Sequence, residues 1–298
     1  MSIKEVCGLL GYTKQAYYKR KNQLQQNRYR EDLVVDLVRK KRKLWKRGSG
    51  RNLHKSLQEE FRDHNMKIGR DKFYDILRAN GLLQLRKRKK VKTTYSYHHF
   101  HKYPNLIKGI EPMGPNQIIV SDITYIWLKN TENYCYLFLT TDMYSRKILG
   151  YCISGNLKAS SALKTIKMAI RTIDASSNCI HHSDRGIQYC CNAYTEHLKR
   201  NSIKISMTEN GDPLENPIAE RINRTIKEEF TTDKTLSFNN LEEAEKEISK
   251  IIRFYNEERP HRSIEMLTPN RAYRLEGKLK RKWKTYYKKN DTSLMELL

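Results

Sequence analysis

Three acidic residues stand inside or beside apolar stretches in the second half of the chain. Asp122 lies in a strand-like run over 117–127, Asp184 follows a short apolar run, and Glu220 opens a helix-like run over 216–227. Carboxylates carried by three separate elements can converge on one point of a folded core. Because Mg²⁺ and Mn²⁺ are hard cations that prefer oxygen ligands, the pattern predicts a divalent-metal site built from Asp122, Asp184 and Glu220.

The residues around these carboxylates predict an α/β core. Alternating apolar residues indicate strands, and apolar residues three and four positions apart indicate helices. The expected strands cover 117–127, 133–141, 147–153, 178–181 and 202–206, and the expected helices cover 158–172, 189–200 and the stretch from 216. This order is typical of a mixed (α+β) five-stranded sheet with helices packed on it.

Charge is unevenly distributed along the chain. The sequence carries 58 Lys and Arg against 33 Asp and Glu, a net charge of +25. Residues 1–110 hold 29 basic and 9 acidic residues, and a further basic run lies in 278–289. Basic segments bind nucleic acid by displacing counterions from phosphates. The sequence therefore predicts a nearly neutral core flanked by arms that bind DNA.

The sequence argues against a membrane protein and against a secreted protein. No apolar run approaches the roughly 20 residues that span a bilayer, and the first residues lack the apolar stretch of a signal peptide. The 6 cysteines include no Cys-x-x-Cys pair, which favours reduced, buried thiols over a zinc site. We expect a cytoplasmic, nucleoid-associated protein with no membrane partner.

These patterns divide the chain into five segments. We expect a short helix-turn-helix-like segment over 1–27, a helical DNA-binding module over 28–85, a basic and aromatic linker over 86–113, the α/β core over 114–275 and a basic tail over 276–298. In the second segment, Arg70 and Lys72 open a helix that ends at Gly81. This helix is the best candidate for insertion into a DNA groove.

The linker begins with a dense run of cations, Arg86, Lys87, Arg88, Lys89 and Lys90, and continues into an aromatic-rich stretch over 95–103. Cations contact phosphates and aromatic rings stack on bases, so we expect this segment to track DNA. A solvated linker is the alternative reading of the same composition, and the two are compatible.

The helix that begins near Glu220 has two different sides. Isoleucines recur at every fourth position along one side, which suits packing on a sheet. Lys227 follows Glu220 by seven residues, nearly two turns, so the two side chains share a face. Asn223 and Arg224 lie between them on that face. We expect Asn223, Arg224 and Lys227 to face a cleft and to contact DNA.

Several motifs together resemble a known family. They are Ser121-Asp122-Ile-Thr-Tyr, His182-Ser-Asp184-Arg-Gly, Glu215-Asn-Pro-Ile-Ala-Glu220 and Tyr255-Asn-Glu-Glu-Arg259-Pro-His261. In this order they resemble the second-reading-frame (OrfB-type) transposases of bacterial insertion sequences, which are related to retroviral integrases. The resemblance covers the whole chain and is most specific over 115–275. The zinc module that opens retroviral integrases has no counterpart here.

The resemblance implies an RNase H-like catalytic core with an Asp-Asp-Glu triad, here Asp122, Asp184 and Glu220, and two Mg²⁺ ions for which Mn²⁺ can substitute. It implies a DDE-type transposase that cleaves and transfers DNA strands and binds the terminal inverted repeats of its element. Arg185 and Gln188 would touch the substrate. The enzyme would act as a homo-oligomer on DNA, with an upstream-frame (OrfA-type) partner or fusion.

Two other functions fit the same sequence. An RNase H-like nuclease that only hydrolyses DNA would need the same carboxylates. A DNA-binding regulator of transposition without catalytic activity would need only the basic segments. Joining of a DNA 3′-hydroxyl end to a second duplex separates the transposase from both alternatives.

Overall fold

The computed structural model describes residues 3–84, 99–173, 178–209, 215–231 and 238–279. The chain divides into two compact units, Met1–Lys90 and Val91–Leu298, which are described separately below. In the described ranges no helix is both long enough and apolar enough to cross a membrane. The predicted run of five cations at 86–90 and most of the predicted tail lie outside these ranges.

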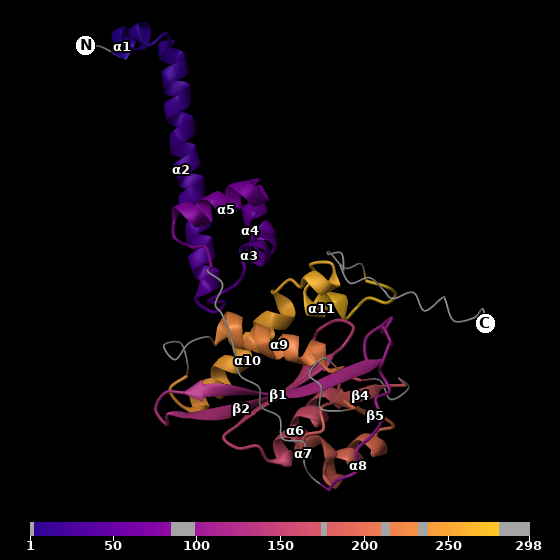
Figure 1. Cartoon of the computed structure of the whole chain (residues 1–298). Coiled ribbons are helices and arrows are strands. Elements are labelled where there is room, and N and C mark those ends of the chain that lie inside the picture. The colour runs from indigo at the N-terminus through magenta and orange to yellow at the C-terminus, as the bar shows by residue number, and fades with distance from the viewer. Residues whose placement is uncertain (1–2, 85–98, 174–177, 210–214, 232–237, 280–298) are drawn as a thin grey trace, which may run out of the picture. The chain divides into compact units, whose positions relative to one another are not determined.

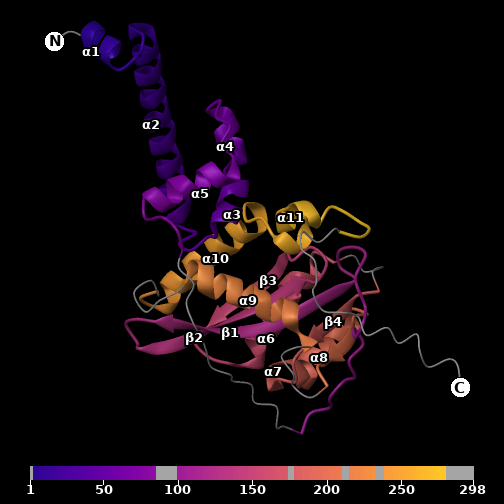
Figure 2. The ribbon, with the colours of Figure 1, turned by 45° about the horizontal axis from the view of Figure 1, so that its top comes forward.

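The N-terminal unit contains helices and no strands in its described residues, 3–84, as expected. Its helices are α1 (Ile3–Leu9), α2 (Lys14–Arg42), α3 (Gly50–Ser56), α4 (Gln58–Asp63) and α5 (Arg70–Ala79). The C-terminal half of α2 packs with α3 and α5 around a core of buried side chains, among them Val34, Val38, Trp45, Leu53, Phe61, Phe73 and Leu77. Figure 2 shows the N-terminal half of α2 extending beyond α5.

Local signals set the ends of these helices. The Thr13 side chain accepts a hydrogen bond from the Ala16 N–H at 3.1 Å and caps α2. α2 then continues for 29 residues because no Gly or Pro interrupts it. It passes through the predicted boundary between 27 and 28, so no break in secondary structure separates those two segments.

The second unit is built on a five-stranded sheet. Its strands are β1 (Ile118–Leu128), β2 (Asn133–Asp142), β3 (Ile148–Ser154), β4 (Ile180–Ser183) and β5 (Lys204–Met207), in the order β3-β2-β1-β4-β5. The first three strands pair antiparallel, and β1, β4 and β5 pair parallel. This is the mixed sheet that the sequence predicts.

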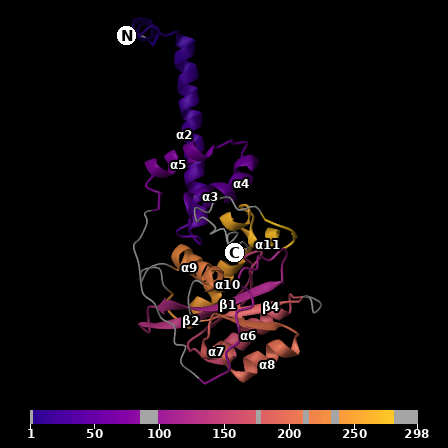
Figure 3. The same ribbon diagram turned by 45° about the vertical axis from the view of Figure 1, so that its right-hand side comes forward.

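Helices cover both faces of this sheet (Figures 1 and 3). One face carries α9 (Pro217–Phe230) and α10 (Leu241–Glu257), and the other carries α6 (Ala159–Ile170), α7 (Ile187–Cys190) and α8 (Asn192–Arg200). Successive residues of β1 face opposite layers: Ile119 packs in the cluster of α6 and α8, whereas Ile118 and Val120 pack with Ala219 of α9. This two-sided burial in a mixed sheet confirms the predicted RNase H-like core.

The layer between β3 and α6 leaves no room for a side chain at Gly150. A Cβ atom added there would lie 2.2 Å from the carbonyl oxygen of Thr165 and 3.0 Å from the Ala169 nitrogen. Both atoms belong to the backbone of α6, so they cannot rotate away. Gly150 therefore sets how closely this helix approaches the sheet.

We expect Gly150→Ala to lower the free energy of unfolding by about 1–3 kcal/mol or more, because α6 must move away from β3. Urea denaturation followed by far-ultraviolet circular dichroism measures this. Gly155→Ala is the matched control, since its Cβ would meet only the Leu241 side chain at 3.8 Å. Equal stability of the two variants would show that the close approach is not required.

Candidate active site

Two of the predicted carboxylates are brought together by the pairing of β1 with β4. The two strands run parallel, and Val120 is the partner of His182 in the register. Asp122 and Asp184 each lie two residues further along their chains, so they stand level on neighbouring strands. Adjacent strands are about 4.8 Å apart. The register therefore places the two acidic side chains side by side at the carboxyl end of β4.

The third carboxylate is positioned by two hydrogen bonds between α9 and β1. Asn216, just before the helix, donates from Nδ2 to the backbone oxygen of Ser121 at 3.1 Å. Asn223, two turns later, donates from Nδ2 to Asp122 Oδ2 at 2.7 Å. Glu220 lies between these two contacts on the same face of the helix. The first turns of α9 are thus held against β1 with Glu220 directed toward Asp122.

The three carboxylates interact electrostatically. Burial and the neighbouring negative charge of Asp184, with a smaller contribution from Glu220, raise the pKa of Asp122 to about 7. Two hydrogen bonds oppose this rise, from the backbone N–H of Ile123 at 2.8 Å and from Asn223. All three side chains are half-buried. Carboxylates this close repel one another unless a proton or a cation lies between them.

The donor atoms suit a hard divalent cation, because all of them are carboxylate oxygens. Within the described residues, no group of three His, Cys, Asp or Glu side chains is already arranged as a ligand set. The carboxylates of Asp122 and Asp184 are instead turned toward hydrogen-bond donors, in the second case the Gly186 N–H at 3.0 Å. Rotation of these side chains toward one another would accompany cation binding.

A buried polar chain supports β1 behind Asp122. The Ser121 hydroxyl lies 2.9 Å from Thr140 Oγ1 on β2 and 2.9 Å from His181 Nε2 on β4. The Tyr194 hydroxyl of α8 lies 2.9 Å from the same histidine nitrogen. Burial lowers the pKa of His181 to about 3, so the ring is neutral at pH 7. The sequence analysis did not identify this network, because its members are far apart in the chain.

The residues predicted to contact DNA near the triad occupy different environments. Lys227 and Arg224 are exposed on α9. Asn223 is buried and bound to Asp122, so in this arrangement its amide orients a carboxylate. Gln188 donates from Nε2 to the backbone oxygen of Leu157 at 3.0 Å, and Arg185 is half-buried.

The predicted contacts in the N-terminal unit are ion-paired. Arg70 pairs with Asp71 at 2.8 Å, and Lys72 pairs with Glu31 of α2 at 2.5 Å. Both cations are exposed at the start of α5. The remaining predicted contacts, Arg86 to Lys90, lie outside the described residues.

The motif that begins at Tyr255 connects the end of α10 to the rest of the core. The Asn256 side chain accepts from the Ile148 N–H and donates to the Ile148 oxygen, both at 3.0 Å, and so pairs with the outer edge of β3. The Tyr255 hydroxyl donates to the Arg146 oxygen at 3.1 Å. These residues are structural, which their place in a family motif could not reveal.

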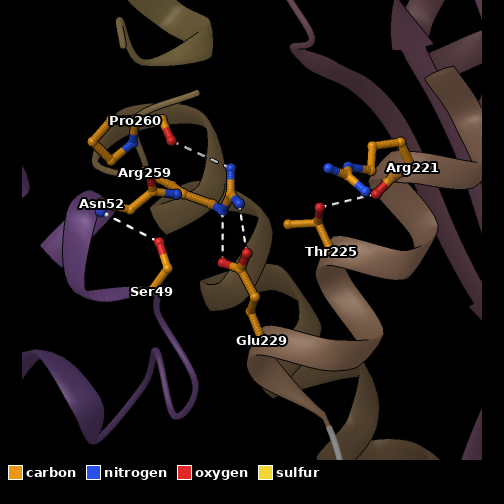
Figure 4. Close-up of polar contacts among 7 residues, drawn as sticks. All are labelled: Ser49, Asn52, Arg221, Thr225, Glu229, Arg259 and Pro260. Atoms are coloured by element: carbon orange, nitrogen blue, oxygen red, sulfur yellow. Dashed lines mark hydrogen bonds and ion pairs between the residues drawn. The ribbon is translucent and has the colours of Figure 1, made fainter. Parts of the chain in front are cut away.

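The same motif also holds α9. The Arg259 guanidinium donates to both carboxylate oxygens of Glu229, at 2.8 and 2.6 Å, and to the Pro260 oxygen at 3.4 Å (Figure 4). The side chains of Arg259 and Glu229 are only 7% and 18% exposed. We call this pair the α9 clasp. It fixes the C-terminal end of the helix whose first turn carries Glu220.

Comparisons with known proteins agree with this architecture. Two models of the integrase core domain match residues 112–213 and 201–269. The chain is 32% identical over 215 residues to the "insertion element IS600 uncharacterized 31 kDa protein" of Shigella sonnei, covering 72% of this chain and 78% of that protein. It is 30% identical over 235 residues to transposase InsF of insertion sequence IS3A from Escherichia coli strain K12, covering 76% and 79%.

Solved structures of integrases align with this chain at low identity. The catalytic core of the HTLV-2 integrase in complex with magnesium aligns with a TM-score of 0.41 and 16% identity, over 55% of this chain and 99% of that one. A chain of the simian T-cell lymphotropic virus intasome aligns with a TM-score of 0.44 and 14% identity, over 78% and 76%.

The family matches and the sheet together define a protein with an integrase-type, polynucleotidyl-transferase core. The chain belongs to the bacterial insertion-sequence transposases that have this retroviral-integrase-like core.

Arg259→Ala tests the α9 clasp. Removal of the guanidinium takes away both hydrogen bonds that Arg259 donates to the half-buried Glu229, so the free energy of unfolding should fall by about 2–3 kcal/mol. The control is Arg200→Ala, which breaks an exposed pair with Glu196 at 3.1 Å and should cost less than about 0.5 kcal/mol. Chemical denaturation of both variants gives the comparison, and similar losses would contradict a buried clasp.

Proposed function

We propose that this transposase cleaves and transfers DNA strands with a divalent-metal centre held by Asp122, Asp184 and Glu220. The observation that carries the proposal is the convergence of three half-buried carboxylates, on β1, just after β4 and on α9. Burial, together with the charges of Asp184 and Glu220, raises the pKa of Asp122. Such mutual repulsion is what a bound cation relieves. The family relationship supports DNA as the substrate, and the basic N-terminal part suits a polyanion.

Each side chain has a distinct part in this mechanism. Asp122, between the other two, would hold both of two Mg²⁺ ions, and Asp184 and Glu220 would each hold one. When bound, such ions activate the attacking oxygen and stabilise the leaving oxygen of a phosphodiester. Asn223 orients Asp122 through its amide N–H. Lys227 is exposed on the same face of α9 as Glu220, nearly two turns further along the helix. It would hold a phosphate next to the carboxylates.

Cleavage and strand transfer differ in the nucleophile, which is water in the first reaction and a DNA 3′-hydroxyl in the second. Water as the nucleophile releases a 3′-hydroxyl at an element end, and that hydroxyl then attacks a phosphodiester of the target DNA. Two element ends must be held together for a complete insertion, so the active species would be a homo-oligomer on DNA. An upstream-frame partner would contribute to recognition of the terminal inverted repeats.

Glu220→Gln tests the triad. We expect this variant to lose more than about 100-fold in strand transfer while its affinity for DNA is unchanged, because an amide cannot supply the charge that holds the metal. The assay offers a labelled duplex with a 3′-hydroxyl end and a supercoiled target, with Mn²⁺, and measures joined product. Glu228→Gln, an exposed change on the same helix, should retain activity. Cleavage without joining by the unmodified chain would identify a nuclease instead.

Removal of divalent cations should abolish both cleavage and joining. Excess EDTA would stop the reaction, and Mg²⁺ or Mn²⁺ added back should restore it, because the proposed mechanism relies on the metal ions to activate the attacking oxygen and to stabilise the leaving oxygen. Titration of Mn²⁺ into the metal-free chain by calorimetry should show binding that Asp122→Asn weakens at least about tenfold. Full activity in EDTA would rule out a metal-dependent mechanism.

A further inference from the structure

The N-terminal half of α2 is a helix with no protein packed around most of its surface. Every residue from Gly8 to Arg30 is exposed. Among the helices that the structure describes in this unit, α1 packs there, through the buried Cys7. Beyond residue 33, by contrast, α2 contributes Val34, Val35 and Val38 to the core. A polar helix without a packed face is not stabilised by hydrophobic burial.

The charge on this segment has one sign. Between Lys14 and Arg30 the helix carries six cations and no acidic residue; the cations are Lys14, Lys19, Arg20, Lys21, Arg28 and Arg30. No ion pair between turns can therefore form within it. In the part of the chain that the structure describes, none of the six side chains makes a hydrogen bond or an ion pair. Their mutual repulsion favours a polyanionic partner.

The cations of α5 differ in this respect. Arg70, Lys72 and Arg78 are each paired with an acidic residue, at 2.8, 2.5 and 2.7 Å. Because acidic side chains of the same unit neutralise these three cations, α5 has little net positive charge to offer a ligand. Of these two helices, α2 is therefore the one with uncompensated cations, although α5 has the more familiar position for a recognition helix.

The cations of α2 are also ordered along the helix. Lys14, Lys21 and Arg28 recur every seven residues, so they form one stripe with a spacing of about 10 Å. Tyr17 and Tyr18 lie beside this stripe and are 41% and 40% exposed. Lys and Arg side chains and tyrosine hydroxyls are groups that contact the phosphates of duplex DNA.

We propose that residues 14–30 of α2 form a contact surface for duplex DNA, with the stripe of Lys14, Lys21 and Arg28 against the phosphates. We call this surface the α2 stripe. The choice of DNA as ligand rests on the proposed transposase function. Continuous basic helices that project from a folded module are known to lie along DNA in this manner.

The test compares two variants of the full chain that lose the same charge. In the first, Lys14, Lys21 and Arg28 are changed to Gln; in the second, Arg70, Lys72 and Arg78 are changed to Gln. Binding to a fluorescently labelled random-sequence duplex is measured by anisotropy between about 50 and 200 mM NaCl. Far-ultraviolet circular dichroism checks that both variants keep the helical content of the parent chain.

We expect the α2 variant to lower the slope of log affinity against log salt by about two to three units, one for each lost phosphate contact. The α5 variant should lower it by less than about one unit. An unchanged slope in the α2 variant, or equal loss in both, would overturn the proposal. Binding to anionic phosphatidylserine vesicles is measured in parallel, and loss there without loss on DNA would also overturn it.

A second measurement covers the case in which a variant fails to fold. Acetylation of the unmodified chain with and without duplex should show Lys14, Lys19 and Lys21 protected by DNA and Lys72 unprotected. Equal labelling with and without DNA would contradict the proposal. Neither result depends on catalysis. Strand transfer by a chain whose α2 lysines are not protected by DNA would contradict the α2 stripe but not the proposed function. Protection of these lysines in a chain without strand transfer would contradict the proposed function but not the α2 stripe.

Discussion

The parallel register of β1 and β4 is the constraint on which the candidate active site depends. It places Asp122 and Asp184 level on adjacent strands, and a shift of one residue would turn one of the two side chains to the opposite face. The residues before these carboxylates are buried on both faces of the sheet. Because a shifted strand would misplace these buried side chains, the layers above and below the sheet fix the register. The register of β1 and β4 thus determines both the packing of the core and the position of Asp122 and Asp184. This explains why these acidic residues stand inside or beside apolar runs.

The cost of this placement is electrostatic repulsion, and the surrounding structure compensates for it. Amide donors from Ile123 and Asn223 hold Asp122, while Asn216 and the α9 clasp hold the two ends of the helix that carries Glu220. α9 is thus fixed before any cation is present. The contacts that fix α9 and the hydrogen bond from Asn223 to Asp122 can persist when a metal binds, so they should serve metal affinity as well as stability. The hydrogen bonds from the Ile123 and Gly186 N–H groups would instead be given up to the ion.

The sequence predicted the class of fold and the strands, because both follow from local periodicity. That Asp122, Asp184 and Glu220 together hold a metal stays a prediction. The sequence did not predict contacts between distant segments. Asn256 pairs with the backbone of Ile148, and Gln188 with that of Leu157, through side chains that look like ordinary surface amides in the sequence. The continuity of α2 was also missed, since the change in composition near residue 28 reflects the start of packing and not the end of a helix.

The most direct measurement of the central claim is anomalous diffraction from crystals of the chain grown with Mn²⁺. The account predicts anomalous density between the carboxylates of Asp122, Asp184 and Glu220, with side chains turned away from the Ile123 and Gly186 N–H groups toward the ion. Asn223 should remain bound to Asp122. Absence of density at this position under saturating Mn²⁺, or ordered Mn²⁺ held by other residues instead, would contradict the account.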